Sequence, residues 1–262
     1  MGSIIAIANQ KGGVGKTTTT ANLGASLALR GRDGKTGLGG LRVLLVDMDP
    51  QGNLTAAFGH QPKDGQTVAE ALLDRKAPLP IVSVTEPGGA KLDLVPASVQ
   101  LAAAEALLTN KLGRELRLRD ALGTVSDKYE YVLIDTPPSL GLLTTNALVA
   151  AQKVIIPTEA RFFSLQGLQM LQESIEETLY LNPKLEVLGI VLSKLDKRLK
   201  EERTVSNYLR DHWGALVFTT EISTNSKILE AASVGVSIFS YQGAERAVGS
   251  YRELAEEVAA RA

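Results

Sequence analysis

QKGGVGKTT, residues Gln10 to Thr18, is the stretch that decides the fold of this 262-residue chain. It follows a short apolar run, Ser3 to Ala8, and leads into a Thr- and Ala-rich segment of helical period, Thr17 to Arg30. Glycines let successive backbone N–H groups curl around phosphate oxygens without Cβ clashes, and the start of the following helix adds partial positive charge. A strand, this loop and a helix in that order predict a phosphate-binding P-loop.

The residue types in the loop predict a nucleoside triphosphate with magnesium. The Lys16 ammonium would reach the β- and γ-phosphates, and the Thr17 hydroxyl would hold the metal. Gln10 stands where the strict pattern G-x-x-x-x-G-K-[ST] has its first glycine, so the loop is a deviant form of that motif. The predicted nucleotide-binding residues are Lys11, Gly12, Gly13, Val14, Gly15, Lys16, Thr17 and Thr18.

Short runs rich in Val and Ile alternate with longer segments of helical period, which is typical of β-α units. The pattern predicts an α/β fold: a single doubly wound, mostly parallel sheet with helices on both faces, in one domain over residues 1–262. Four glycines in Gly34 to Gly40 predict a flexible insertion within residues 32–41, and residues 244–261 are predicted to form a packed C-terminal helix. The predicted strands are Ser3–Ala8, Arg42–Asp47, Tyr131–Asp135, Lys153–Pro157 and Val187–Leu192, with weaker candidates at Leu92–Pro96 and Leu216–Thr219. The predicted helices are Thr17–Arg30, Ser98–Leu122, Ser164–Leu181 and Thr204–His212.

Composition excludes several classes of chemistry. The 28 Lys and Arg residues nearly balance 29 Asp and Glu residues, so nucleic acid would have to bind a local basic patch rather than a global field. The chain has no cysteine, which removes disulfides, thiolate metal sites and cysteine nucleophiles. With no signal-like or membrane-spanning apolar run, the chain is expected in the cytoplasm.

Three carboxylates are the candidate partners of the metal and the attacking water. The apolar strand Tyr131 to Ile134 delivers Asp135 to a carboxyl end of the sheet, where it could hold magnesium through water. Asp47 and Asp49 leave the second predicted strand two positions apart, so both side chains would face the same side. An Asx-type turn at Asp49-Pro50 is an additional interpretation that is compatible with a catalytic role.

These motifs resemble the ParA/MinD family of deviant P-loop ATPases, and the chain is most similar to Soj-like ParA partition proteins. The resemblance rests on four segments in order: Lys11–Thr18, Val46–Asn53, Tyr131–Ser139 and Leu229–Ser233. It implies ATP and Mg²⁺ as cofactors, Lys11, Lys16 and Asp49 as catalytic residues, and Asp47 as a partner of the magnesium-bound waters. It also implies that Lys11 reaches the phosphates of a second copy across an ATP-sandwich homodimer, and that Asp49 activates the attacking water.

The same resemblance implies non-specific binding of double-stranded DNA, association with the nucleoid, and stimulation of ATP hydrolysis by a ParB-like partner during DNA segregation. Between Lys194 and Arg210 the chain carries a net charge of +3, from six basic residues (Lys194, Lys197, Arg198, Lys200, Arg203 and Arg210) against Asp196, Glu201 and Glu202. Such a run is also typical of a solvated helix face. The predicted DNA-binding residues are Arg198, Lys200, Arg203 and Lys227.

Alternatives remain for the nucleotide base that the protein binds and for the cellular surface on which it acts. Ser193-Lys194-Leu195-Asp196 resembles the guanine-reading motif of GTPases, whereas the family resemblance favours adenine, with base contacts near Thr220 to Asn225. A MinD-like positioning ATPase acting at a membrane would need a basic amphipathic tail, and Ala244 to Ala262 is Glu-rich instead. We therefore expect no membrane partner. ParA-like positioning of a protein cargo stays an alternative, and a nitrogenase-type reductase lacks the cysteines it would need.

Overall fold

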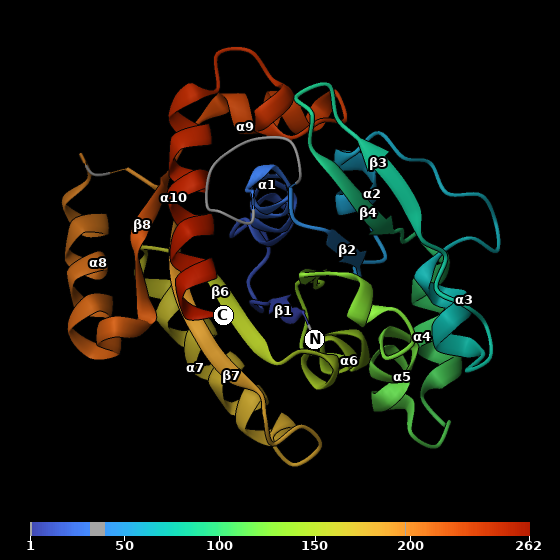
Figure 1. Cartoon of the computed structure of the whole chain (residues 1–262). Helices are drawn as coiled ribbons and strands as arrows, with labels where there is room; N and C mark the ends of the chain where they lie inside the picture. The colour runs from blue at the N-terminus through green and yellow to red at the C-terminus, as the bar shows by residue number, and fades with distance from the viewer. Residues whose placement is uncertain (1, 32–39, 197) are drawn as a thin grey trace.

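One eight-stranded sheet runs through the described part of the chain, in a computed structural model that describes residues 2–31, 40–196 and 198–262 (Figure 1). The strand order is β3-β4-β2-β5-β1-β6-β7-β8, and only the edge pair β3–β4 is antiparallel. The mostly parallel α/β sheet predicted from the sequence is therefore confirmed. The strands are β1 (Ser3–Ile7), β2 (Val43–Asp47), β3 (Val82–Thr85), β4 (Lys91–Val95), β5 (Tyr131–Asp135), β6 (Lys153–Glu159), β7 (Glu186–Leu195) and β8 (Val217–Ser223).

Helices cover both faces of the sheet, and side chains that alternate along each central strand supply two separate cores. In β1, Ile5 and Ile7 belong to the core under α1 and α10, while Ala6, and Ala8 directly after the strand, belong to the core under α3 to α8. Central strands buried on both faces explain the continuous apolar runs of the sequence. The helices are α1 (Lys16–Leu29), α2 (Asn53–Ala57), α3 (Val68–Leu73), α4 (Gln100–Leu108), α5 (Arg117–Leu122), α6 (Leu142–Ala150), α7 (Phe162–Thr178), α8 (Lys200–Trp213), α9 (Ser226–Ser233) and α10 (Glu245–Arg261).

The last helix, α10, packs against the sheet instead of presenting its apolar face to solvent (Figure 1). Tyr251, Leu254 and Val258 on that face are fully buried. The Glu257 carboxylate accepts hydrogen bonds from the backbone N–H groups of Thr219 and Thr220, which fastens the helix to β8. Within the described residues, no helix combines the length and apolar character that crossing a bilayer requires.

The single helix expected over Ser98 to Leu122 is wrong in one respect, because the structure divides it into α4 and α5. Gly113 adopts a left-handed conformation, with φ of 63°, between the two helices. A residue with a Cβ avoids that conformation, so the chain turns there instead of continuing as a helix. Leu112, which fitted the helical period, is 94% exposed in the turn.

The carboxyl ends of three adjacent strands meet where the predicted site residues lie. Asp135 at the end of β5 is in register with Ile7 of β1 on one side and Asp47 of β2 on the other. Ligands of open α/β sheets bind outside such carboxyl ends. Of the other sequence predictions, residues 32–39 of the insertion predicted at 32–41, and Lys197, lie outside the described residues.

Candidate functional site

The loop between β1 and α1 has the backbone that a phosphate cradle needs. Gly13 and Gly15 adopt left-handed conformations, with φ of 76° and 91°, which glycine accepts without strain. A Cβ built on Gly13 would meet no atom within 4 Å, so space is open beside the loop. Gly15 caps α1 without a side chain, and therefore leaves the first N–H groups of the helix available to an anion.

Lys16 lies inside this loop. Its ammonium donates a hydrogen bond to the Lys11 carbonyl oxygen at 3.2 Å, and the residue is only 6% exposed. Burial lowers the pKa of Lys16, while the negative charges of Asp135 and Asp49 act in the opposite direction. A phosphate group would supply the negative charge that a buried ammonium needs.

Thr17 and Asp135 form the candidate metal site. The Thr17 hydroxyl donates to Asp135 Oδ2 at 2.7 Å, and the Thr20 hydroxyl donates to Oδ1 of the same carboxylate at 3.2 Å. Asp135 is fully buried, and burial, followed by the charge of Asp47, raises its pKa. A hard cation fits this oxygen set and would favour the ionised carboxylate. No group of three or more acidic or histidine side chains suited to a metal occurs among the described residues, so magnesium would depend on phosphate and water oxygens as well.

Asp47 fixes the turn that follows β2. Its Oδ1 accepts from the Asp49 N–H at 3.1 Å, and its Oδ2 accepts from the backbone N–H and the hydroxyl of Thr55 at 2.9 and 2.7 Å. Burial raises the pKa of Asp47 to about 6, although the Thr55 hydrogen bonds act against that rise. Both carboxylate oxygens thus have protein partners, and the predicted contact with magnesium-bound water stays a prediction. Thr55 itself was not among the predicted site residues.

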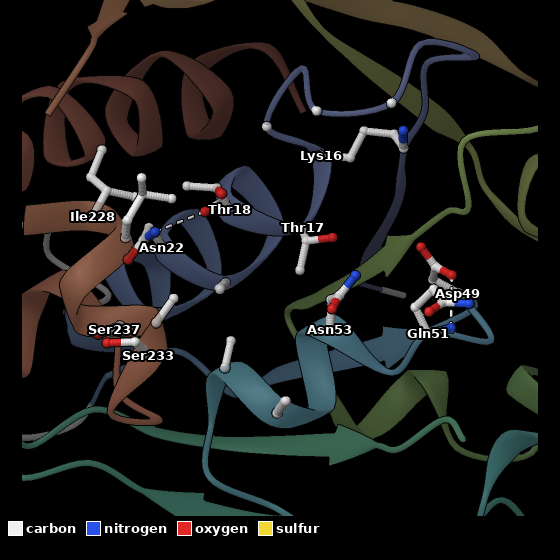
Figure 2. A pocket seen from close by; sticks show the side chains of 18 of the residues that line it. Lys16, Thr17, Thr18, Asn22, Asp49, Gln51, Asn53, Ile228, Ser233 and Ser237 are labelled. Carbon is white, nitrogen blue, oxygen red and sulfur yellow. Dashed lines mark hydrogen bonds between the residues drawn. The ribbon is translucent and has the colours of Figure 1, made fainter. Parts of the chain in front are cut away.

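Asp49 makes the Asx-type turn that the sequence suggested. Its Oδ1 accepts from the Gln51 N–H at 2.9 Å, and the side chain also lines the cavity beside the P-loop (Figure 2). One carboxylate oxygen therefore orders the turn, while the other forms no hydrogen bond with the described residues, so a structural and a catalytic role are compatible.

The cavity has a volume of about 510 Å³ and extends from the P-loop to α2 and α9 (Figure 2). Lys16, Thr17 and Thr18 come from the start of α1, whereas the far wall includes Ile228 and Ser233 of α9. The sequence did not predict this wall, because α9 approaches α1 only through the fold. Asn22, Asn53 and Ser237 are further lining residues that sequence reasoning missed.

The expected base-contacting segment is not part of this wall. None of the described residues from Thr220 to Asn225 lines the cavity, although Lys194 does. The carboxylate of Asp196, the potential guanine reader, is hydrogen-bonded by the Arg198 guanidinium at 2.6 Å. This bond lowers the pKa of Asp196 to about 2. The geometry therefore gives the guanine-reading interpretation no support.

Lys11 projects away from its own phosphate loop. Its ammonium pairs with Glu159 Oε2 at 3.0 Å and lies 3.4 Å from the Ser164 hydroxyl. The two lysines of the loop thus point to different places, with Lys16 inside the cradle and Lys11 outside it.

The predicted DNA-binding cations divide into two kinds. Arg198 is paired with Asp196, and Lys227 is paired with Glu230 at 2.6 Å. Lys200 and Arg203 are exposed on α8, and no carboxylate in the described residues forms an ion pair with either side chain. Of the four predicted DNA-binding cations, only Lys200 and Arg203, both on α8, therefore form no ion pair within the described residues.

A phosphate cradle on a mostly parallel sheet, with a threonine and a buried aspartate beside it, defines a P-loop ATPase. The family model for an "AAA domain" matches residues 2–187. The chain is 42% identical to the sporulation initiation inhibitor protein Soj of Bacillus subtilis, over 99% of both chains. It is 41% identical to the chromosome partitioning protein ParA of Caulobacter vibrioides, over 98% of this chain and 94% of that protein.

The chain belongs to the ParA/Soj family of partition ATPases, and the resemblance inferred from its motifs is confirmed. A solved structure of cobyrinic acid a,c-diamide synthase from Mycobacterium smegmatis, with bound ATP analogue and magnesium, is also similar. It is 35% identical, with a TM-score of 0.79, and the match covers 98% of this chain and 93% of that protein.

Proposed function

We propose that this protein is an ATP-driven partition ATPase that dimerises when it binds ATP, holds DNA without sequence preference, and releases it after hydrolysis. The observation that carries the proposal is the separation of the two lysines in one loop. Lys16 is buried in its own cradle, whereas the Lys11 ammonium lies outside that cradle. A second cation directed away from the loop is suited to phosphates bound by another copy.

Within one protomer, Gly12 to Thr18 bind the phosphates, and Lys16 neutralises the β- and γ-phosphate charge. Thr17 and Asp135 hold Mg²⁺, Asp135 through water, and Asp47 orders the segment that carries Asp49. Magnesium supplies electrostatic stabilisation of the phosphoryl group as it is transferred. Asp49 orients the attacking water from the turn that its other oxygen fixes. The ATP analogue and magnesium bound by the Mycobacterium smegmatis protein support this choice of ligands.

Lys11 acts in trans. In the dimer its ammonium contacts the triphosphate held by the partner, so that each site is complete only when two copies meet. In other phosphoryl-transfer systems a cation supplied in trans raises the rate by about 10³- to 10⁵-fold. Hydrolysis in this protein is accordingly slow in the protomer and coupled to dimerisation, with a ParB-like partner accelerating it.

DNA binding depends on the dimer because a two-fold axis places two copies of α8 on one assembly. Lys200 and Arg203 contribute the cations that form no ion pair with the described residues. Arg198 and Lys227 contribute if phosphate displaces their carboxylate partners. Cargo segregation in the cytoplasm, on the nucleoid, follows from cycles of binding and release. The names of the Soj and ParA relatives support this role.

A membrane-acting alternative is disfavoured by α10. The apolar residues of its face, Tyr251 and Leu254 among them, are buried in the protein's own core. A helix that binds a bilayer surface needs its apolar face free. We therefore propose DNA rather than lipid as the polymeric surface, with a ParA-like protein cargo as the remaining alternative.

Light scattering with ATP and with ADP tests the proposal. We expect a dimer with ATP, a monomer with ADP, and no ATP-dependent dimer for Lys11→Ala although this variant still binds nucleotide.

Sedimentation of the ATP-loaded protein with plasmid DNA, and in parallel with anionic liposomes, should give retention on DNA alone. If the protein is monomeric with ATP as well as with ADP, or is retained on liposomes alone, the proposal is refuted.

A further inference from the structure

Glu159 is the one carboxylate that contacts the Lys11 ammonium among the described residues. It is the last residue of β6, and its Oε2 lies 3.0 Å from Lys11 Nζ. Ser164, buried near the start of α7, offers its hydroxyl oxygen to the same ammonium at 3.4 Å. The lysine that the proposed function directs toward a partner is therefore bound within its own protomer in this structure.

Two further cations surround Glu159. Arg161 Nε lies 3.9 Å from Oε2, and Lys194 Nζ lies 3.9 Å from Oε1. Three cations thus share one carboxylate whose side chain is 15% exposed. If Lys11 leaves, Glu159 keeps Lys194 and also Arg161, which lies 3.7 Å from Glu202 as well, so the carboxylate is not left without a nearby cation. The arrangement allows Lys11 to exchange one anion for another.

We propose that Glu159 is a positioning residue that holds Lys11 on its own protomer until a partner's triphosphate replaces the carboxylate. This inference rests on the proposed role of Lys11 in trans. The intramolecular pair stabilises the free protomer and thereby opposes dimerisation.

The test is the dimer dissociation constant of Glu159→Gln in the non-hydrolysable analogue AMP-PNP, measured by analytical ultracentrifugation. A partly exposed ion pair shifts such an equilibrium by about threefold. We expect about tenfold tighter dimerisation, because two lysines are released for each dimer formed. The association rate of the dimer should rise while its dissociation rate stays at the wild-type value, because the Glu159–Lys11 pair exists only in the free protomer. General disruption of β6 would not change the association rate alone. Nucleotide affinity of the protomer should be unchanged.

Glu186→Gln is the matched control. It removes a carboxylate that pairs with Lys153 at the opposite end of β6, and should leave dimerisation unchanged. If wild-type protein dimerises and Glu159→Gln dimerises equally or more weakly, the positioning role is overturned while the proposed function stands. If wild-type protein does not dimerise in AMP-PNP, both fall together.

Discussion

Lys16 combines burial with a position at the open end of the phosphate cradle. Its ammonium donates one hydrogen bond to a backbone carbonyl oxygen. A neutral carbonyl offsets the cost of burying the positive charge less well than an anion does. Because hydrogen bonds to charged groups contribute more than neutral ones, we expect Lys16→Ala to weaken ATP binding by about 10- to 100-fold. Titration calorimetry with Mg-ATP measures this. Lys111→Ala, at an exposed site, is the control, and wild-type affinity in Lys16→Ala would contradict the assigned role.

The substitution Asp49→Asn separates the structural role of Asp49 from its catalytic role, because it replaces one carboxylate oxygen by an amide group. Asp49→Asn keeps an amide oxygen that can accept from the Gln51 N–H, so the turn should persist, but the negative charge is lost. We expect a single-turnover hydrolysis rate lower by about 10²-fold or more, with ATP-dependent dimers retained. Asp49→Ala should lose both the rate and the turn. Hydrolysis at the wild-type rate in Asp49→Asn would show that Asp49 serves the turn alone.

At the scale of single residues, the sequence predicted the side chains that share a motif and missed those that come from elsewhere. Lys16, Thr17 and Asp135 were predictable because a strand end and a glycine loop fix their positions locally. Thr55, which orders Asp47, and Glu159, which binds Lys11, carry no motif signal. Glu159 lies 148 positions from Lys11, so only the pairing of β6 with β1 brings them together.

The packing of α10 against the sheet should make the stability of the folded protein depend on pH. Burial raises the pKa of Tyr251 above its ordinary value of 10, so the folded protein keeps the phenol neutral where the unfolded chain ionises it. Because the unfolded state then binds fewer protons, stability falls as pH rises above 10. This residue alone contributes a slope of about 1.4 kcal/mol per pH unit there.

Tyr251→Phe tests that docking. The variant should show a shallower loss of the free energy of unfolding between about pH 10 and pH 11, by about the slope of one proton. Guanidinium denaturation at several pH values measures the difference. Tyr180→Phe, at a 92% exposed site, should retain the wild-type slope. Equal slopes for wild type and Tyr251→Phe would mean that the Tyr251 hydroxyl is not sequestered by α10.

At the scale of elements, the long apolar strands of the central sheet were predicted, the edge strand β8 was predicted only as the weaker candidate Leu216–Thr219, and the other edge strand, β3, was not predicted. The four residues of β3 are half-exposed or exposed and lie at the sheet edge, so they lack the buried apolar run that identified the other strands. The far wall of the cavity was missed for a different reason. Ile228 has no motif signal, and Ser233 belongs to a segment that contributed to the family resemblance without a predicted site role; the approach of α9 to α1 gives both a place in the site.

At the scale of the whole molecule, the charge sum over residues 194–210 overstated the surface available to DNA. A sum counts Arg198 and Arg210 as free cations, whereas the structure pairs Arg198 with Asp196 and Arg210 with Glu221. Pairing is a property of side-chain geometry, which composition does not contain. Lys200 and Arg203, which form no ion pair with the described residues, remain on α8, at the opposite side of the molecule from α3 to α5 (Figure 1).

The double reversal Lys200→Glu and Arg203→Glu should therefore abolish DNA retention by the ATP-bound dimer more effectively than neutralising Arg198 and Lys227, which already have carboxylate partners. Each lost phosphate contact lowers the slope of log affinity against log salt by about 0.9, so four cations per dimer account for a change of up to about 4. Fluorescence anisotropy with a duplex at several salt concentrations measures the slope. Lys76→Glu and Lys111→Glu form the matched control, with the same charge change at exposed positions near α3 and α4. If that control weakens binding as much as the α8 variant does, the effect is one of net charge, and α8 is not the DNA-binding surface.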